Sequence, residues 1–332
     1  MAAEPISVVI TVRQDRQGLA EVLAALAVQT RPADEILVVD AGSDDGTAEV
    51  VDYWRERGLP LRAVDAPDMG ISAGRNAGIE SAANERIAVT DAGCRPEPGW
   101  LAELEHGFER ADFVGGTYTV ETTTPLEHAV AVSLYPAVGE IEARDTPTRL
   151  WQLVFGRRFT PRGATGRSMA FTREAWRNGG GFPEQVNAGE DVAFSAAVID
   201  AGASAVLAPR AEVTWRGRDT WRGNATMYFR YAQGDALLGR RSRAAARLFA
   251  WSAFAWLLLS PHRGTRFFGL LWLIAYSWVP ARRASRSGLA PVHWWRIPYA
   301  LAVKDAAMIA GAVSGLRRHG LIVPDDEHRS AA

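Results

Sequence analysis

The chain has 332 residues, of which 48% are hydrophobic and 23% are charged, so it is long enough for about two domains and apolar enough to bury a core. This composition excludes an intrinsically disordered chain and a small disulfide scaffold. The net charge of −1 conceals an asymmetry, because residues 1–204 carry 18 basic and 31 acidic side chains whereas residues 205–332 carry 19 and 7.

The first 110 residues alternate between short apolar runs and amphipathic stretches. The apolar runs predict strands at residues 6–12, 35–40, 61–65 and 86–91. The amphipathic stretches predict helices at residues 17–29, 45–57, 72–83 and 99–110. This alternation is typical of a doubly wound, mostly parallel sheet with helices on both faces. Ligands bind at the carboxyl ends of such strands, where Asp40 and Asp91 are the last residues of two runs.

The next segment is less regular. It predicts strands at residues 112–120, 166–171 and 204–208, and helices at residues 124–138, 173–178 and 190–201. Residues 143–165 are rich in arginine and poorly periodic, which predicts a mobile loop.

The last third combines basic and apolar segments. Residues 224–243 predict a basic amphipathic helix, and the apolar runs 248–260 and 267–280 follow it, with arginines on their flanks. Each run is shorter than the roughly 20 residues that cross a bilayer. They are interpreted as tight transmembrane segments, a re-entrant hairpin or interfacial helices, with a buried hairpin of a soluble domain as the alternative. Arginine clusters beside such runs do not suit a nucleic-acid surface, and no nucleic-acid motif is present.

The amino terminus and the cysteine content bear on the compartment. The sequence MAAEPISVVITV lacks the basic region and cleavage site of a signal peptide, so we expect the first part of the chain in the cytosol. The single cysteine, Cys94, excludes an internal disulfide and is interpreted as a small buried residue.

Five motifs occur in order over residues 6–200. They are ISVVITVRQD, EILVVDAGSDDGT, GISAGRNAGI, VTDAGCRPEPGWL and GGFPEQVNAGEDVAFSAAV. In this order and spacing they resemble the inverting glycosyltransferases of family 2, which have the GT-A fold. The last third resembles the membrane-associated tails of bacterial members.

The resemblance implies a nucleotide-sugar donor, with uridine as the family expectation. It assigns donor binding to a set of residues that follow the predicted strands: Thr11, Arg13, Asp40, Arg75, Asn76 and Asp91. Arg75 and Asn76 lie near the start of a predicted helix, where N–H groups and an arginine suit phosphate. Asp44, Asp45 and Thr47 are interpreted as turn and cap residues only.

The metal motif of the family is incomplete in this chain. Asp91-Ala92-Gly93 occupies the place of the Asp-x-Asp signature, so Asp91 is left as the candidate ligand of Mg²⁺ or Mn²⁺, and no late histidine follows the catalytic acids. One hypothesis is that Arg216, Arg218 and Arg222 neutralise part of the diphosphate charge. The alternative is that these arginines face lipid phosphates.

The catalytic acids are expected in Gly189-Glu190-Asp191. Without the resemblance, an acid at a helix start is interpreted as a cap that the helix dipole stabilises. The resemblance implies that Asp191 is the general base and that Glu190 places the acceptor, with Gly181 and Phe182 on the acceptor side.

These observations predict two regions. A GT-A catalytic domain covers residues 1–212, with nucleotide-sugar binding in 1–120 and the acceptor side in 121–212, and membrane-associated helices cover 213–332. We expect transfer to a lipid-linked or polysaccharide acceptor of the cell envelope, at the cytoplasmic face of the membrane and in contact with its lipids. The alternative is a catalytically silent GT-A domain that binds nucleotide sugar or anchors an assembly. The absence of G-x-G-x-x-G after the first strand excludes a dinucleotide-binding oxidoreductase.

Overall fold

The computed structural model describes residues 4–319 apart from residues 156, 187 and 240. Within them the chain divides into two compact units, with the boundary between Gly217 and Arg218. The first unit therefore includes the whole of the last strand, which ends at Arg216.

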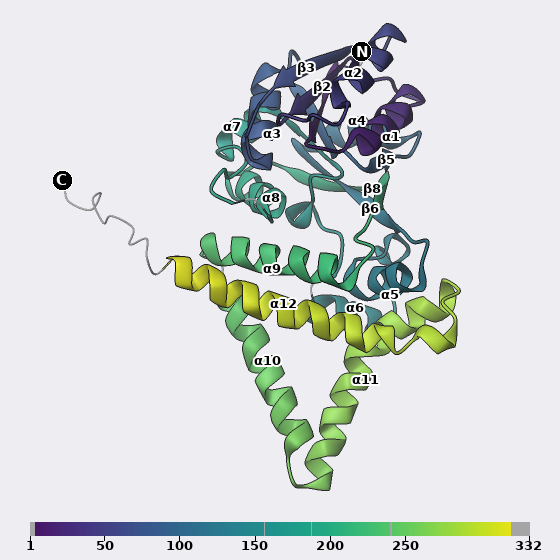
Figure 1. Cartoon of the computed structure of the whole chain (residues 1–332), viewed down its shortest axis with the longest axis vertical. Coiled ribbons are helices and arrows are strands. Elements are labelled where there is room, and N and C mark those ends of the chain that lie inside the picture. Colours follow the sequence, from purple (N-terminus) through teal and green to yellow (C-terminus); the bar gives the residue numbers. More distant parts are fainter. Residues whose placement is uncertain (1–3, 156, 187, 240, 320–332) are drawn as a thin grey trace, which may run out of the picture. The chain divides into compact units, whose positions relative to one another are not determined.

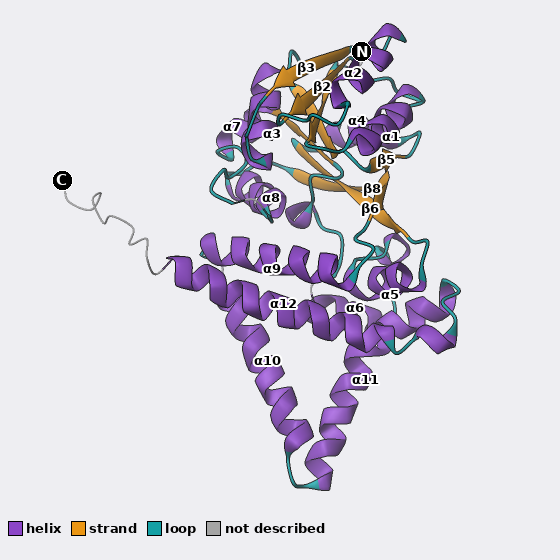
Figure 2. Cartoon of the chain, in the orientation of Figure 1, coloured by secondary structure: helices purple, strands orange, loops and turns teal. Residues whose placement is uncertain are grey.

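The first unit is built on a mixed sheet (Figure 2). Its described strands are β1 (Ile6–Val12), β2 (Glu35–Asp40), β3 (Leu61–Asp65), β4 (Arg86–Asp91), β5 (Cys94–Pro96), β6 (Phe113–Glu121), β7 (Met169–Thr172) and β8 (Ala205–Arg216). They lie in the order β3-β2-β1-β4-β7-β6-β8-β5. The first four strands of this order are parallel, and β6 is also parallel to β8. Since β7 runs antiparallel to β4 and β6, the sheet is mostly but not wholly parallel, as the sequence predicts.

Helices of the first unit cover the sheet. They are α1 (Arg16–Ala27), α2 (Thr47–Glu56), α3 (Ile71–Ser81), α4 (Trp100–Phe108), α5 (Pro125–Leu134), α6 (Thr146–Phe155), α7 (Arg173–Asn178) and α8 (Glu190–Asp200), with 3₁₀ turns η1 (Val138–Glu140) and η2 (Pro161–Gly163). The strands β1, β2 and β4 are buried along nearly their whole length because both of their faces are covered. Gly78 lets α3 approach closely, since a Cβ there would lie 2.7 Å from methyl groups of Val9 and Val39.

Three features differ from the sequence-based predictions. Residues 143–165, predicted as a mobile loop, contain the helix α6 and the turn η2. The three-residue strand β5 was not predicted, because it forms only by pairing with the distant strand β8. The last strand, predicted at residues 204–208, begins at Ala205 and continues to Arg216, since β6 pairs with it along almost its whole length.

The second unit is helical. It contains α9 (Trp221–Leu237), α10 (Arg241–Leu259), α11 (Arg263–Arg286), the 3₁₀ turn η3 (Pro291–His293) and α12 (Arg296–His319). The long helices α9 and α12 lie side by side (Figure 1). Gly311 and Gly315 make this possible, because a Cβ at Gly311 would lie 2.1 Å from the carbonyl oxygen of Phe229 and one at Gly315 would lie 2.7 Å from Cβ of Ala236.

The helices α10 and α11 form an apolar hairpin. The runs predicted at residues 248–260 and 267–280 lie in these two helices. Large apolar side chains are exposed along the hairpin, including Phe249 at 75%, Trp256 at 67% and Phe268 at 61%. The hairpin is therefore not buried among the described residues.

Only one described segment is long and apolar enough to cross a membrane by length and composition. It is Pro291–Arg317, which includes most of α12, with a mean hydropathy of 1.3 and a third of its apolar window buried within the protein. The two predicted runs of the hairpin do not reach this length and hydropathy, and the sequence patterns did not single out α12.

Candidate active site

A cavity of about 520 Å³ opens at the carboxyl ends of β1 and β2. We call it the β1–α3 cavity, and its lining residues are Thr11, Val12, Arg13, Val39, Ala41, Asp68, Met69, Gly70, Ile71 and Gly74. Both Thr11 and Arg13, predicted from the sequence as donor-binding residues, line it. The first turn of α3 also contributes to the wall, so backbone N–H groups of a helix start face this region.

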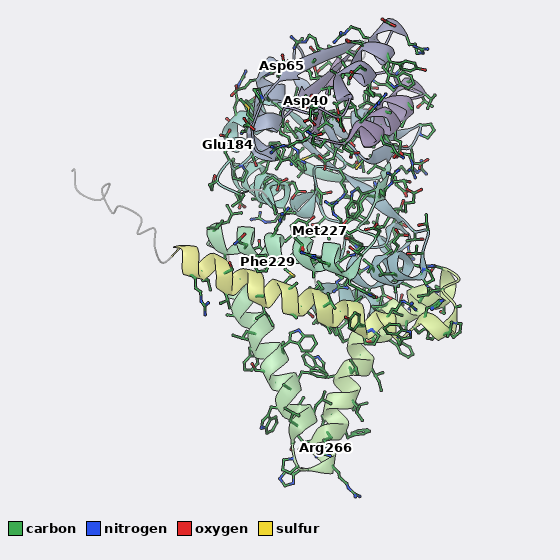
Figure 3. All side chains as sticks on the ribbon, viewed as in Figure 1. Asp40, Asp65, Glu184, Met227, Phe229 and Arg266 are labelled. Carbon is green, nitrogen blue, oxygen red and sulfur yellow. The ribbon has the colours of Figure 1, made fainter. Side chains whose placement is uncertain are left out.

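Asp40 ends β2 beside this cavity. Its Oδ1 accepts hydrogen bonds from the backbone N–H and the hydroxyl group of Ser43, at 2.9 and 2.7 Å. Its Oδ2 has no hydrogen-bond partner among the described residues. Asp65 ends the adjacent strand β3 as the register partner of Asp40, so the two carboxylates occupy the same edge of the sheet (Figure 3).

The buried side chain of Arg75 connects Asp91 and Glu190. The side chain of Arg75, on α3, is 1% exposed, and its Nη2 donates to Oδ1 of Asp91 at 2.6 Å while its Nη1 donates to Oε1 of Glu190 at 2.7 Å. Its Nε is buried without a hydrogen-bond partner among the described residues. The structure therefore brings Arg75, Asp91 and Glu190 together from three elements, and the enclosed guanidinium binds two carboxylates of the protein.

The electrostatics of this cluster follow from burial and charge. Burial alone would lower the pKa of the Arg75 guanidinium, but the charges of Asp91, Glu190 and Asp191 outweigh that effect and raise the pKa. Burial and the adjacent Asp191 raise the pKa of Glu190 above its ordinary value, and Arg75 opposes the rise. With these three acids ionised, one arginine leaves the cluster with two uncompensated negative charges.

Asp191 lies in the first turn of α8, after Gly189, whose φ of 78° starts the helix. Its Oδ2 accepts a hydrogen bond from the backbone N–H of Gly166 at 3.1 Å. A side chain at position 166 would collide with Arg75, because a Cβ there would lie 2.3 Å from Nη2. Gly166 therefore holds both the arginine and the second acid, and neither periodicity nor motif spacing singled it out.

Asn76 is used to hold the acceptor-side loop. Its Nδ2 donates to the carbonyl oxygen of Phe182 and to Glu184, and its Oδ1 accepts from the N–H of Phe182 and the indole N–H of Trp176. Gly181 has a φ of 73°, and Phe182 is 1% exposed and stacks on Phe194 with ring centroids 4.0 Å apart. In this structure Asn76 has no polar atom left for a ligand, and Phe182 belongs to the core beneath the site.

Of the three late arginines, Arg216 belongs to the first unit, where its side chain binds another acid. The backbone N–H of Arg216 bonds the carbonyl oxygen of Gly93 at 3.4 Å, but its Nη2 binds Oε1 of Glu21 at 2.6 Å. Glu21 in turn lies 3.4 Å from Arg95. Arg218 and Arg222 belong to the second unit.

Comparisons with known proteins show what this chain is similar to. Residues 7–147 match the model of glycosyl transferase family 2. The chain is 28% identical over 212 residues to glycosyltransferase AglE of Haloferax volcanii, covering 61% of this chain and 64% of that protein. It is 31% identical over 87 residues to the uncharacterized glycosyltransferase YibD of Escherichia coli, covering 26% of this chain and 25% of that protein.

The family match and the glycosyltransferase relatives support a family 2 glycosyltransferase, as the sequence motifs predict. Among solved structures, the mannosyltransferase PcManGT of Pyrobaculum calidifontis, in complex with GDP-Man and Mn²⁺, superposes with a TM-score of 0.55 at 20% identity, covering 94% of this chain and 87% of that one. This likeness confirms the GT-A fold predicted from the sequence. The chain spans just under two thirds of the length of AglE.

The described residues of the candidate site hold no preformed metal centre. No group of three or more His, Cys, Asp or Glu side chains that could hold an ion occurs among the described residues. Gly93 has a φ of 80° and no side chain, and Asp91 uses Oδ1 for Arg75. Oδ2 of Asp91 has no hydrogen-bond partner in the described part of the chain, so one carboxylate oxygen remains for a cation.

Cys94 adjoins this family 2 site but offers no nucleophile. It is fully buried, and burial, followed by the charge of Asp91, raises the pKa of its thiol to about 12. The side chain is therefore a neutral thiol at physiological pH, in agreement with its interpretation as a small buried residue.

Proposed function

We propose that this protein is an inverting glycosyltransferase that moves a sugar from a nucleoside-diphosphate donor to an acceptor hydroxyl group. The observation that carries the proposal is the path from the cavity to the acids. Thr11 lines the β1–α3 cavity and is the register partner of Asp91, and Gly74 lines the cavity immediately before Arg75. A donor whose nucleoside fills the cavity would therefore extend toward Asp91, Glu190 and Asp191.

The cavity suits the nucleoside part of the donor. Its volume of about 520 Å³ and its mixture of Val and Ile side chains with Thr11 and Arg13 fit a planar base and a ribose. Arg13 is accessible, with 62% of its side chain exposed and only a loose 3.9 Å contact to Asp68. Asp40 lies between the lining residues Val39 and Ala41, and its Oδ2 can accept a hydrogen bond from a base or ribose.

Asp191 is the general base in this proposal. Glu190 is 5% exposed and its Oε1 is bound to Arg75, so this carboxylate is buried and paired with a protein cation. Asp191 is only half-buried and has one bond from another segment, the amide of Gly166, which orients it without neutralising it. It accepts the proton of the acceptor hydroxyl as that oxygen attacks the anomeric carbon in line, and the nucleoside diphosphate leaves from the opposite face.

The diphosphate requires positive charge. The cluster contains three acidic side chains and one arginine that is ion-paired with two of them, and Arg216, whose backbone N–H bonds the carbonyl oxygen of Gly93, uses its guanidinium to bind Glu21. Mg²⁺ commonly binds one or two carboxylates, substrate phosphates and water. We therefore favour a divalent cation that enters with the donor and is held by Asp91 over the hypothesis of arginines alone, and such an ion would neutralise the leaving diphosphate. Loss of transfer in excess chelator, restored by Mg²⁺ or Mn²⁺, supports this choice, and full activity in chelator overturns it.

The second unit is proposed as the membrane-contacting part. The α10–α11 hairpin exposes aromatic and aliphatic side chains, while α12 is packed against α9 through Gly311 and Gly315. Exposed apolar surface of this kind is stable in lipid and unfavourable in water. The hairpin, rather than α12, is therefore the segment that we propose inserts from the cytoplasmic face, and the acceptor is proposed to be lipid-linked or a glycan made at that surface.

Binding and chemistry can be tested separately. Thermal-shift measurements on the full chain with a panel of nucleotide sugars should show stabilisation by at least one, since a ligand of the native state raises the melting temperature. Arg13→Ala should weaken this shift, and Arg177→Ala, on the exposed end of α7, should not. A donor that binds without any nucleotide release would instead support a catalytically silent domain.

A further inference from the structure

A second cavity, of about 860 Å³, lies in the first unit between η1 and α6. We call it the α6 cavity. Three arginines line it, Arg144, Arg149 and Arg158, and all three side chains are exposed and form no ion pair with the described residues. Its acidic lining residues are Glu140, which accepts a hydrogen bond from Gln152, and Glu142. The balance of charge on the wall is positive.

The same cavity has an apolar side. Leu150 and Leu153 line it and are 57% and 67% exposed. Val154 continues this face of α6 and is 60% exposed, whereas Trp151 on the opposite face is buried. Leu153 and Val154 are three and four positions after Leu150, so the three aliphatic side chains form one stripe of the helix. An apolar stripe beside unpaired arginines fits a ligand that has both a long hydrocarbon part and an anionic group.

A buried cation adjoins the cavity in sequence. Arg157 precedes Arg158 and is 6% exposed, with its guanidinium 5.2 Å from the ring centroid of Trp151. Both of its terminal nitrogens are buried without a hydrogen-bond partner among the described residues. Leaving a buried charge without an anionic partner is unfavourable, so this position is suited to an anion that the protein itself does not supply.

The α6 cavity is connected to the proposed catalytic base. Thr160 lines the cavity and caps η2, and six residues later Gly166 donates its amide hydrogen to Asp191. The hydroxyl group of Ser195 on α8 also donates to the carbonyl oxygen of Ala164 in the same segment. The segment 158–166 therefore joins the arginines of the cavity to α8.

We propose that the α6 cavity binds a lipid-linked phosphate or diphosphate, and that this amphiphile is the acceptor. The arginines bind its phosphate group, and Leu150, Leu153 and Val154 contact the start of its hydrocarbon chain. The inference rests on the proposed function, because it names the acceptor class of the same site.

The test is equilibrium binding of farnesyl phosphate to the detergent-solubilised full chain, with farnesol and inorganic phosphate as separate probes. Farnesyl phosphate should bind at least tenfold more tightly than either other probe, since only it has both parts. The double variant Arg149→Ala/Arg158→Ala should weaken its binding by about tenfold or more, because each charge-assisted contact contributes roughly a factor of ten. The matched variant Arg110→Ala/Arg177→Ala, which removes two exposed arginines elsewhere in the unit, should leave it unchanged.

Further variants test the apolar stripe and Arg157. Leu150→Ser/Leu153→Ser should weaken farnesyl phosphate binding and leave the binding of inorganic phosphate unchanged. Arg157→Met should also weaken farnesyl phosphate binding, yet raise the melting temperature without the probe, because it removes a buried unpaired charge. A lower melting temperature and unchanged binding would show Arg157 to be structural and would remove it from the site.

Several outcomes would overturn the proposal. If inorganic phosphate binds as tightly as farnesyl phosphate, the cavity is only a phosphate site, and if farnesol does so, it is only an apolar groove. If the matched variant Arg110→Ala/Arg177→Ala weakens farnesyl phosphate binding as much as Arg149→Ala/Arg158→Ala does, the effect is general charge attraction. Nucleotide-sugar binding is measured on the same samples. If nucleotide sugar binds and farnesyl phosphate does not, the lipid-phosphate inference fails alone, whereas failure of nucleotide-sugar binding overturns the proposed function.

Discussion

Replacing Arg75 with methionine should destabilise the protein in a pH-dependent way. The substitution keeps an apolar stem of similar length but removes both hydrogen bonds, at 2.6 Å to Asp91 and 2.7 Å to Glu190. Breaking a buried ion pair by removing one partner costs about 3–5 kcal/mol, and the lower end applies because the Asp91 side chain is 27% exposed and partly hydrated. We therefore expect a loss of about 3 kcal/mol at pH 8.

The sign of the pH dependence follows from Glu190. Its pKa is already raised by burial and by Asp191, and removing the opposing Arg75 charge raises it further. In the variant, the folded state therefore binds a proton at a higher pH than the unfolded state does. The stability of Arg75→Met relative to the native protein should recover as the pH falls through this raised pKa, and it should decline as the pH rises.

The assay is urea unfolding at pH 5 and pH 8, followed by tryptophan fluorescence. Arg75→Lys keeps the charge but cannot bond both acids through the same planar fork, so it should lose stability with a weaker dependence on pH. Arg177→Met, on the exposed face of α7, is the control and should be neutral at both pH values. Equal loss for Arg75→Met at pH 5 and pH 8 would refute the electrostatic account and leave only packing.

Three other predictions concern the metal motif, the cysteine and the hairpin. Gly93→Asp should create Mn²⁺ binding that calorimetry detects without nucleotide, because a Cβ at position 93 lies 3.5 Å from Oδ2 of Asp15 and has room. The positive φ of this position makes the substitution cost about 1 kcal/mol of stability. Gly93→Ala should not create this binding, and equal Mn²⁺ binding by both variants would contradict the assignment of Asp91 as a metal ligand. Cys94, with its pKa raised to about 12, should resist a disulfide reagent at pH 8 until the protein unfolds, and fast labelling of the native protein would show that the thiol is accessible. Trp256→Ser/Phe268→Ser should reduce co-sedimentation with anionic phospholipid vesicles, whereas Tyr53→Ser, an exposed aromatic residue of the first unit, should not; unchanged sedimentation of the hairpin variant would rule out insertion of this hairpin.

The parallel half of the sheet could be predicted because its signals are local. The predicted strands at residues 35–40, 61–65 and 86–91 are short and mostly apolar, and the strands found there have the same bounds. The strands at residues 35–40 and 86–91 are buried along nearly their whole length, so their pattern needs no knowledge of distant segments. The elements that were missed depend on such knowledge, since β5 exists only through pairing with β8 and α6 is amphipathic in a segment dominated by arginine.

The candidate site was predicted in part. Motif order placed Glu190, Asp191, Asp91 and Arg75 among the functional residues, but their mutual contacts span up to 115 positions and leave no local pattern. For the same reason, the sequence did not show that Asn76 is committed to the loop at Phe182 or that Arg216 is bound to Glu21. Gly166 could not be found at all, because its importance lies in the space that its missing side chain leaves for Arg75.

The central claim is that Asp191 is the general base of sugar transfer. The most direct test measures the release of nucleoside diphosphate from the nucleotide sugar that binds, in the presence of acceptor, for the native chain and for Asp191→Asn. The account predicts that the variant keeps donor affinity, because Asp191 lies beyond the β1–α3 cavity, and loses about 10²–10⁴-fold in turnover, the usual contribution of a positioned base. Turnover by Asp191→Asn at the native rate would contradict the account and remove Asp191 from the mechanism.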